Sequence, residues 1–157
     1  MIVVVMGVSG CGKSTVGPLL ASRLGYAFLD ADEFHPPANV AKMAAGTPLT
    51  DADREPWLEL LNAKLRVQEN AVLACSALKE SYRRILAQGL ADCRFVHLRG
   101  SIELIRARLA ARRHRYMPAS LLESQFAALE PPAGAIEVDI SNDAPQCVAA
   151  IVSRLAG

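Results

Sequence analysis

The first residues that could do chemistry form a glycine-rich run near the amino terminus: Gly7, Val8, Ser9, Gly10, Cys11, Gly12, Lys13 and Ser14. The run matches G-x-x-x-x-G-K-[ST], in which backbone N–H groups surround the phosphates of a nucleotide. In that motif the lysine reaches the β- and γ-phosphates, and the hydroxyl that follows it binds Mg²⁺. The pattern predicts a phosphate-binding loop that takes ATP and Mg²⁺, with Thr15 as a further nucleotide contact.

Motors, switches and kinases all use such loops, so the rest of the chain must separate them. The guanine-specific pattern Asn-Lys-x-Asp does not occur in the sequence. A later apolar run ends in Cys75-Ser76, where motor ATPases carry the acidic pair that activates water. Residues 136–139 could imitate that pair, but we interpret them as a final strand. The pattern favours a small-molecule kinase, and a nucleotide-binding regulator with weak hydrolysis is the alternative.

Two carboxylates follow a second apolar run, at Asp30 and Asp32. If the extended geometry continues, residues i and i+2 project to the same side, at the sheet edge where open α/β folds bind ligands. We expect Asp30 to lie near the Mg²⁺ shell and Asp32 to accept the proton of an attacking hydroxyl. Which carboxylate does which task stays open, and a strand-end turn or helix cap is the alternative.

Short runs rich in Val, Ile and Leu alternate with stretches of helical period, which is typical of an α/β protein with a buried parallel sheet. We expect strands at Ile2–Met6, Ala27–Asp30, Ala71–Ser76, Arg94–Leu98 and Ile136–Ile140. We expect helices at Lys13–Leu24, Asn39–Ala45, Asp51–Glu69, Lys79–Gln88, Ser101–Arg113, Ala119–Leu129 and Pro145–Leu155. Thr50 or Asp51 is the expected N-cap of the third helix.

The composition restricts the class of protein. A length of 157 residues with 52% hydrophobic and 21% charged positions fits one domain over residues 1–157. The formal net charge of +1 gives no global attraction to nucleic acid, and the apolar amino terminus is too short for a signal peptide or a membrane span. The four cysteines form no CxxC pair, so we expect reduced thiols and a cytoplasmic protein that binds neither membrane nor nucleic acid.

Taken together, these residues resemble the bacterial-type gluconate kinases, which are relatives of the shikimate kinases. The similarity covers nearly the whole chain. It rests on Met6–Ser14, Phe28–Asp32, His35-Pro36, Asn39, Lys42-Met43, Gly46–Leu49, Asp51–Leu58, Cys75–Lys79, Tyr82-Arg83, Gln125-Phe126 and Leu129-Glu130. The resemblance implies a P-loop NTPase fold with a five-stranded parallel sheet, a mobile lid, a homodimer, and ATP:D-gluconate 6-phosphotransferase activity. Shikimate or another sugar acid is the alternative acceptor.

The chemistry of gluconate agrees with several of these residues. Gluconate is a polyhydroxylated anion, so its site needs a cation for the carboxylate and several hydrogen-bonding groups. Arg54 offers a bidentate fork, and Lys79 with Arg83 would share one helical face at i and i+4. Ser76 and Tyr82 could add hydroxyl contacts. The alternatives are an exposed partner of nearby acids for Arg54 and a solvated helix face for Lys79 and Arg83.

A basic stretch follows the fourth expected strand, with Arg106, Arg108, Arg112, Arg113, His114 and Arg115 within ten residues. We expect a lid over approximately residues 106–125 in which Arg112 stabilises the transferring phosphoryl group. By the resemblance, Arg108 lies on the nucleotide side. The family commonly has Gly-His before an aromatic residue where this chain has His114-Arg115, so the conformation of the lid is an open question.

Overall fold

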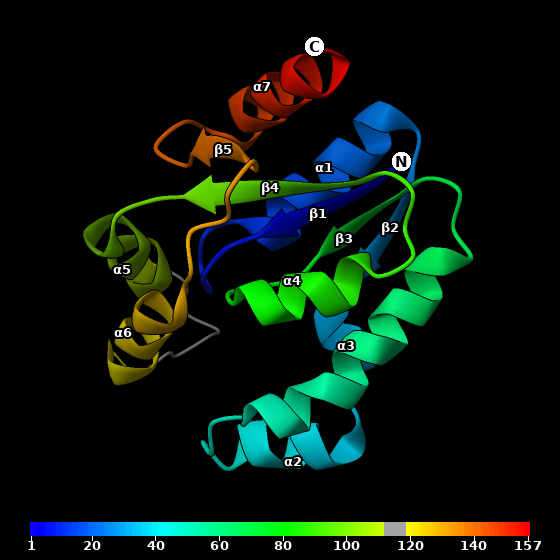
Figure 1. The fold of residues 1–157 in the computed structure, drawn as a ribbon. Coiled ribbons are helices and arrows are strands. Elements are labelled where there is room, and N and C mark those ends of the chain that lie inside the picture. Colours follow the sequence, from blue (N-terminus) through cyan, green and yellow to red (C-terminus); the bar gives the residue numbers. More distant parts are fainter. Residues whose placement is uncertain (112–118) are drawn as a thin grey trace.

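The computed structural model describes residues 1–111 and 119–157. Its centre is a five-stranded sheet with the order β2-β3-β1-β4-β5 and every pairing parallel (Figure 1). The strands are β1 (Ile2–Met6), β2 (Ala27–Asp30), β3 (Ala71–Ala74), β4 (Cys93–Arg99) and β5 (Ile136–Asp139). This arrangement confirms the α/β class and the five-stranded parallel sheet.

The central strand β1 is buried along its whole length. It pairs with β3 on one side and β4 on the other, and helices cover both of its faces. Val3 and Val5 face one apolar core, while Val4 and Met6 face the second core on the other side of the sheet. A strand that is enclosed in this way must be apolar at every position rather than at alternate ones, which explains the unbroken run at the amino terminus.

Two helix layers enclose the sheet. On one face, α1 (Lys13–Leu24) packs with α7 (Ala144–Ala156), and on the other face lie α3 (Asp51–Arg66) and α4 (Glu80–Ala87) (Figure 1). The neighbouring helices α5 (Ile102–Ala111) and α6 (Ala119–Ala128) lie beyond the carboxyl end of β4. The helix α2 (Pro37–Ala44) completes the elements between β2 and α3.

Several boundaries differ from the sequence expectation. The strand β3 ends at Ala74, two residues before the expected end, and α3 ends at Arg66 instead of Glu69. A 3₁₀ helix over Ala31–Phe34, which the sequence did not predict, follows β2 directly. The N-cap of α3 is Thr50, whose side chain accepts a hydrogen bond from the Asp53 N–H in a capping box.

None of the helices in the described ranges has both the length and the apolarity needed to cross a bilayer.

The four cysteines are free thiols, and Cys11, Cys75 and Cys147 are buried. Burial raises the pKa of the Cys75 thiol to about 12, so this side chain is an unreactive part of the core beside the sheet edge.

Candidate active site

The glycine-rich run forms the loop between β1 and α1. Its shape depends on glycine, because Gly10 and Gly12 have φ values of +82° and +103°, which side-chain-bearing residues rarely adopt. A Cβ added at Gly10 would also lie 2.9 Å from the Leu109 side chain. The backbone conformation and the packing against α5 therefore both favour glycine at position 10.

The start of α1 is suited to bind an anion. Gly12 is its N-cap and makes no side-chain capping bond, and the first turn carries no acidic residue. Its N–H groups and the positive end of the helix dipole are therefore available for phosphate. Lys13 Nζ lies 2.9 Å from the Gly7 carbonyl oxygen and 3.1 Å from that of Val8, which holds the ammonium group against the loop. Ser14 is exposed, and its hydroxyl is available to a metal–nucleotide complex.

The two carboxylates after β2 do not project from a continuing strand. The Asp30 carboxylate accepts a hydrogen bond of 3.0 Å from the Asp32 backbone N–H, and the chain turns into the 3₁₀ helix at Ala31. The expectation of one extended segment is therefore wrong at this point, because the Asp30 side chain caps the turn. The Asp32 side chain is 83% exposed at the carboxyl end of the sheet, where an incoming hydroxyl could reach it.

Beside Asp32, the ring of His35 is almost completely buried. It stacks on Trp57 with 4.0 Å between ring centroids, and Nδ1 lies 3.3 Å from Asn39 Nδ2. Burial lowers the pKa of His35 most, the nearby Asp32 raises it, and the positive charge of Arg54 lowers it further. Trp57 is in the core and donates its indole N–H to the Ala31 carbonyl.

A polar cluster between α3 and α4 contains Asp51, Arg54, Lys79 and Tyr82. Lys79 Nζ lies 3.1 Å from the Asp51 carboxylate, and the Tyr82 hydroxyl donates to the same carboxylate. Arg54 Nη1 donates to the Tyr82 hydroxyl at 3.3 Å and to a backbone carbonyl, at Leu49. The structure therefore brings together the predicted cations Arg54 and Lys79. They are linked through Tyr82 and Asp51, which are 31 residues apart in the sequence.

The same contacts shift the pKa values of the side chains in this cluster. Hydrogen bonds from Tyr82 and then Lys79 lower the pKa of Asp51. The bond to Asp51 in turn raises the pKa of Lys79. Burial and the bond to Asp51 raise the pKa of Tyr82. At neutral pH the cluster thus holds one carboxylate and two cations, which leaves a net positive charge for an anionic ligand.

Arg83 lies apart from this cluster and is only 4% exposed. Its guanidinium donates to the Ala77 carbonyl at 2.7 Å and to the Glu130 carbonyl at 2.9 Å. The helical face expected for Lys79 and Arg83 does not form, because α4 begins at Glu80 and Lys79 is its extended N-cap. Arg83 instead supports the loop before α4, where Ala77 has a φ of +45°.

That loop also contacts the phosphate-binding loop directly. The carbonyl oxygen of Ser76 accepts a hydrogen bond of 3.2 Å from the Gly7 N–H. Ser76 is half-buried at the carboxyl end of β3. This bond places Ser76 beside the phosphate-binding loop, and the hydroxyl contact to the acceptor stays a prediction.

In the region predicted to form a lid, Arg106 of α5 pairs with Glu123 of α6 at 2.6 Å. Arg108 donates to the Ile140 carbonyl in the loop after β5. Arg112, the predicted catalytic arginine, lies outside the described residues, as do Arg113, His114 and Arg115.

One contact to the phosphate-binding loop was missed by the analysis of residue types. Gln125 of α6 accepts a 2.7 Å hydrogen bond from the Ser9 N–H and donates a 3.0 Å bond to the Ser9 hydroxyl. A lone glutamine carries no chemical signature, so the only signal was its place in the Gln125-Phe126 motif of the family resemblance. The roles of Asp51 and Glu130 were missed for the same reason.

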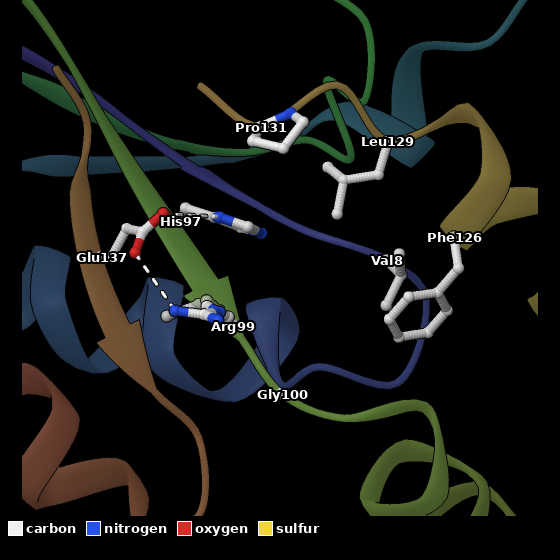
Figure 2. A pocket seen from close by; sticks show the side chains of 9 residues that line it. Val8, His97, Arg99, Gly100, Phe126, Leu129, Pro131 and Glu137 are labelled. Atoms are coloured by element: carbon white, nitrogen blue, oxygen red, sulfur yellow. Dashed lines mark ion pairs between the residues drawn. The ribbon is translucent and has the colours of Figure 1, made fainter. Parts of the chain in front are cut away.

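A pocket of about 340 Å³ lies next to the loop, at the β4–β5 edge of the sheet (Figure 2). His97, Arg99 and Glu137 line one side, and Val8, Phe126, Leu129 and Pro131 line the other. Arg99 Nη1 lies 3.6 Å from the Glu137 carboxylate. Burial lowers the pKa of His97 most, and among the described residues its Nδ1 has no hydrogen-bond partner.

The described residues contain no group of three or more His, Cys, Asp or Glu side chains placed to hold a metal ion. Mg²⁺ does not require such a group, because it usually binds through one or two protein oxygens together with phosphates and water. Ser14 and Asp30 are the oxygens that the sequence assigned to this ion. Their side chains lie at the start of α1 and at the end of β2.

Comparisons with known proteins agree on one group. A family model for shikimate kinase matches residues 9–129. A gluconokinase from Gluconobacter oxydans is 54% identical over 133 residues, which is 82% of this chain and 75% of the relative. A probable gluconokinase from Xenopus tropicalis is 44% identical across 100% of this chain and 92% of its own length. The crystal structure of a gluconokinase from Sinorhizobium meliloti has a TM-score of 0.92 at 42% identity, and the match covers 98% of this chain and 90% of that one.

Proposed function

This chain belongs to the gluconokinases, a group of shikimate-kinase-like P-loop kinases, and we propose that it phosphorylates D-gluconate to 6-phospho-D-gluconate with ATP. The observation that supports the acceptor best is the Arg54–Tyr82–Asp51–Lys79 cluster. It holds two cations and one carboxylate on the acceptor side of a loop built for phosphates. An anionic, hydroxyl-rich molecule suits both its charge and its hydrogen-bonding groups.

On the nucleotide side, the N–H groups at the start of α1 bind the phosphates and Lys13 balances their charge. The loop holds the Lys13 ammonium group through the carbonyls of Gly7 and Val8, so little reorganisation is needed when the nucleotide binds. When bound, Mg²⁺ supplies further charge neutralisation on the β- and γ-phosphates. Ser14 and Asp30 are the side chains that would hold it.

On the acceptor side, Asp32 accepts the proton of the attacking hydroxyl. Its carboxylate is exposed at the sheet edge, while the Asp30 carboxylate is engaged with the Asp32 N–H. This difference supports Asp32 as the base and Asp30 as the metal-side group. Arg54 and Lys79 bind the gluconate carboxylate, and Ser76 offers a hydroxyl between the two ligands. Arg83 acts on this site through the loop that it holds in place.

Three further features belong to the proposal. Residues 106–125 act as a lid, in which Arg112 stabilises the transferring phosphoryl group and Arg108 lies on the nucleotide side. The protein is a homodimer, as the family resemblance implies. It works in the cytoplasm, without a nucleic-acid or membrane partner.

An ADP-release assay with ATP and Mg²⁺ tests the acceptor. We expect turnover with D-gluconate to far exceed turnover with D-glucose, because a cationic pocket loses its ionic contact when the carboxylate is absent. Shikimate should also be poor, because its rigid ring presents the hydroxyls in another arrangement. A preference for glucose would contradict the anionic pocket, and a preference for another sugar acid would keep the mechanism but change the substrate. Turnover that no acceptor stimulates would favour the regulator hypothesis.

A further inference from the structure

Six residues that follow the middle of α6, Gln125–Glu130, contact both loops of the candidate site. We call this segment the strap. It contains the Gln125-Phe126 and Leu129-Glu130 pairs of the family resemblance, and none of these side chains has a task in the transfer described above. The strap joins the described lid-side helix to the sheet, and each of its two ends is tied to a different loop.

The first end of the strap is tied to the phosphate-binding loop. Gln125 is 116 positions away from Ser9 in the sequence, yet its side-chain amide makes two hydrogen bonds to that residue. The bond from the Ser9 N–H, at 2.7 Å, satisfies a backbone donor inside the loop. A shift of Ser9 when phosphates enter the loop would therefore pull or release the Gln125 side chain.

The other end of the strap is tied to the loop that precedes α4. The Glu130 carboxylate accepts a 2.6 Å bond from the Glu80 N–H, at the start of that helix. The Glu130 N–H donates to the Leu78 carbonyl at 2.8 Å, and the Glu130 carbonyl accepts from Arg83 at 2.9 Å. These three bonds fix residues on both sides of Lys79 in the sequence, and Lys79 is one of the two cations proposed to bind the acceptor.

Between its ends the strap is short and stiff. The Leu129 N–H donates to the Gln125 carbonyl at 3.0 Å, so a helical turn connects the two tied regions. Phe126 and Leu129 lie on the wall of the pocket that faces the β4–β5 edge (Figure 2). That pocket, of about 340 Å³, lies between these two side chains and His97, Arg99 and Glu137 on its other side.

We propose that Gln125 is a positioning residue, and that the strap transmits the state of the phosphate-binding loop to the segment Leu78–Arg83 before and within α4. Nucleotide binding would thus adjust the position of Lys79 before the acceptor arrives. The names of the two ligands rest on the proposed function, but the mechanical link does not. It can therefore be tested without any acceptor.

Hydrogen–deuterium exchange of the full chain, with and without a non-hydrolysable ATP analogue and Mg²⁺, tests the link. In the wild type, we expect the analogue to slow exchange in the phosphate-binding loop and also in a peptide that covers residues 77–86. In Gln125→Met, which keeps the side-chain length but loses both hydrogen bonds, the second effect should vanish while the first remains. Ser124→Ala, a neighbouring change that removes a hydroxyl donating to the Leu121 carbonyl, should keep both.

A second variant tests the link from its other end and guards against a misfolded Gln125→Met protein. Glu130→Ala removes the bond to the Glu80 N–H and leaves the Gln125–Ser9 contact in place. It should also weaken the analogue-induced change at residues 77–86, although the two bonds made by the Glu130 backbone remain. A wild type without that change, or either folded variant that retains it in full, would overturn the proposal.

Kinetics separates this inference from the proposed function. If D-gluconate is the acceptor, Gln125→Met should raise KM for gluconate about fivefold at saturating ATP, which is the low end of measured couplings between sites. A merely structural role would lower the melting temperature without changing KM for gluconate. If gluconate is not phosphorylated at all, the proposed function fails, and the exchange experiment still decides whether the strap couples the two loops.

Discussion

The nucleotide side and the acceptor side of the site are built from different materials. On the nucleotide side, the binding groups are backbone N–H donors at the start of α1, shaped by glycines with positive φ. On the proposed acceptor side, the candidate groups are side chains of α3 and of the loop and helix at α4, held in place by one another. The groups on the nucleotide side come from consecutive residues, whereas those on the acceptor side are far apart in the sequence and meet only when the chain folds.

This difference has a consequence for binding. The Lys13 ammonium group is held by carbonyl oxygens, so no carboxylate in the described part of the chain competes with phosphate for it. Lys79, in contrast, is paired with Asp51, and an anionic acceptor must compete with that carboxylate. We therefore expect changes on the nucleotide side to alter the rate strongly, and changes on the acceptor side to alter affinity moderately.

The largest effect should follow from Lys13→Ala, which removes the cation that we propose for the transferring phosphoryl group. We expect kcat/KM to fall by on the order of 10⁴-fold, with an unchanged melting temperature because Lys13 contributes little to the core. Arg23→Ala, which removes a cation from the other end of α1, is the matched control and should be near normal. Near-normal turnover of Lys13→Ala would remove the phosphate-loop assignment.

Asp32→Asn should come next, with a loss in kcat of roughly 10²–10³-fold if Asp32 is the general base. KM for ATP should change much less, because the carboxylate acts on the acceptor hydroxyl. Glu33→Gln, its neighbour in the same 3₁₀ helix, should have little effect. A change confined to ATP or Mg²⁺ affinity would move Asp32 to the metal shell and leave Asp30 as the candidate base.

The sequence was sufficient to predict the sheet and the phosphate-binding loop. Both depend on local patterns: buried parallel strands are apolar at every position, and the anion-binding loop needs its glycines in a fixed order. The five strands and their parallel pairing agree with that prediction, while the strand order is known only from the structure. The 3₁₀ helix after β2 was missed because it depends on which N–H the Asp30 side chain selects, and Asp-x-Asp is compatible with strand, turn or cap.

The polar partners of the site could not be predicted in the same way. Arg83 was expected to share a helical face with Lys79 and to bind the acceptor, but its guanidinium donates to two backbone carbonyls and is buried. The partner of Lys79 is Asp51, 28 residues earlier in the chain. The bonds of Gln125 to Ser9 span 116 positions. Such pairs depend on how the elements pack, and no local spacing encodes them.

A moderate effect is expected from Tyr82→Phe, which tests the acceptor side directly. The hydroxyl donates to Asp51 and accepts from Arg54, and the substitution removes both bonds. If this costs about 1 kcal/mol of gluconate binding, KM for gluconate rises roughly fivefold. KM for ATP should stay constant. Tyr26→Phe, at a tyrosine packed against the core near α1 and α7, is the control. An equal change in KM for both substrates would contradict the separation of the two sides.

A smaller effect concerns stability in acid. The hydrogen bond from Lys42 is the largest cause that lowers the pKa of Asp53 from 3.8 to about 2. A folded-state pKa below the unfolded one stabilises the protein above pH 3.8, and this stabilisation is lost as the pH falls toward 2. Melting temperatures between pH 5 and pH 2 should therefore fall less steeply in Asp53→Asn than in the wild type, and Lys42→Met should show the same flattening. Parallel curves would mean that the bond between α2 and α3 does not hold in solution.

The smallest effect is spectroscopic and uses the only tryptophan of the chain. His35 stacks on Trp57, so protonation of the imidazole should change the indole fluorescence. Because burial is the largest cause and lowers the pKa of His35, the titration midpoint should lie below 6.5, and His35→Gln should abolish the step. A midpoint at or above 6.5 would mean that the attraction of Asp32 outweighs burial.

The same titration can report what binds on the acceptor side. The positive charge of Arg54 contributes to the lowered pKa of His35, so neutralising that charge should raise the midpoint. Arg54→Met should shift it upward, and bound gluconate should shift the wild type in the same direction if its carboxylate pairs with Arg54. D-glucose, which has no charge, should leave the midpoint in place. A gluconate shift that persists in Arg54→Met would assign the carboxylate to another cation, with Lys79 as the next to test.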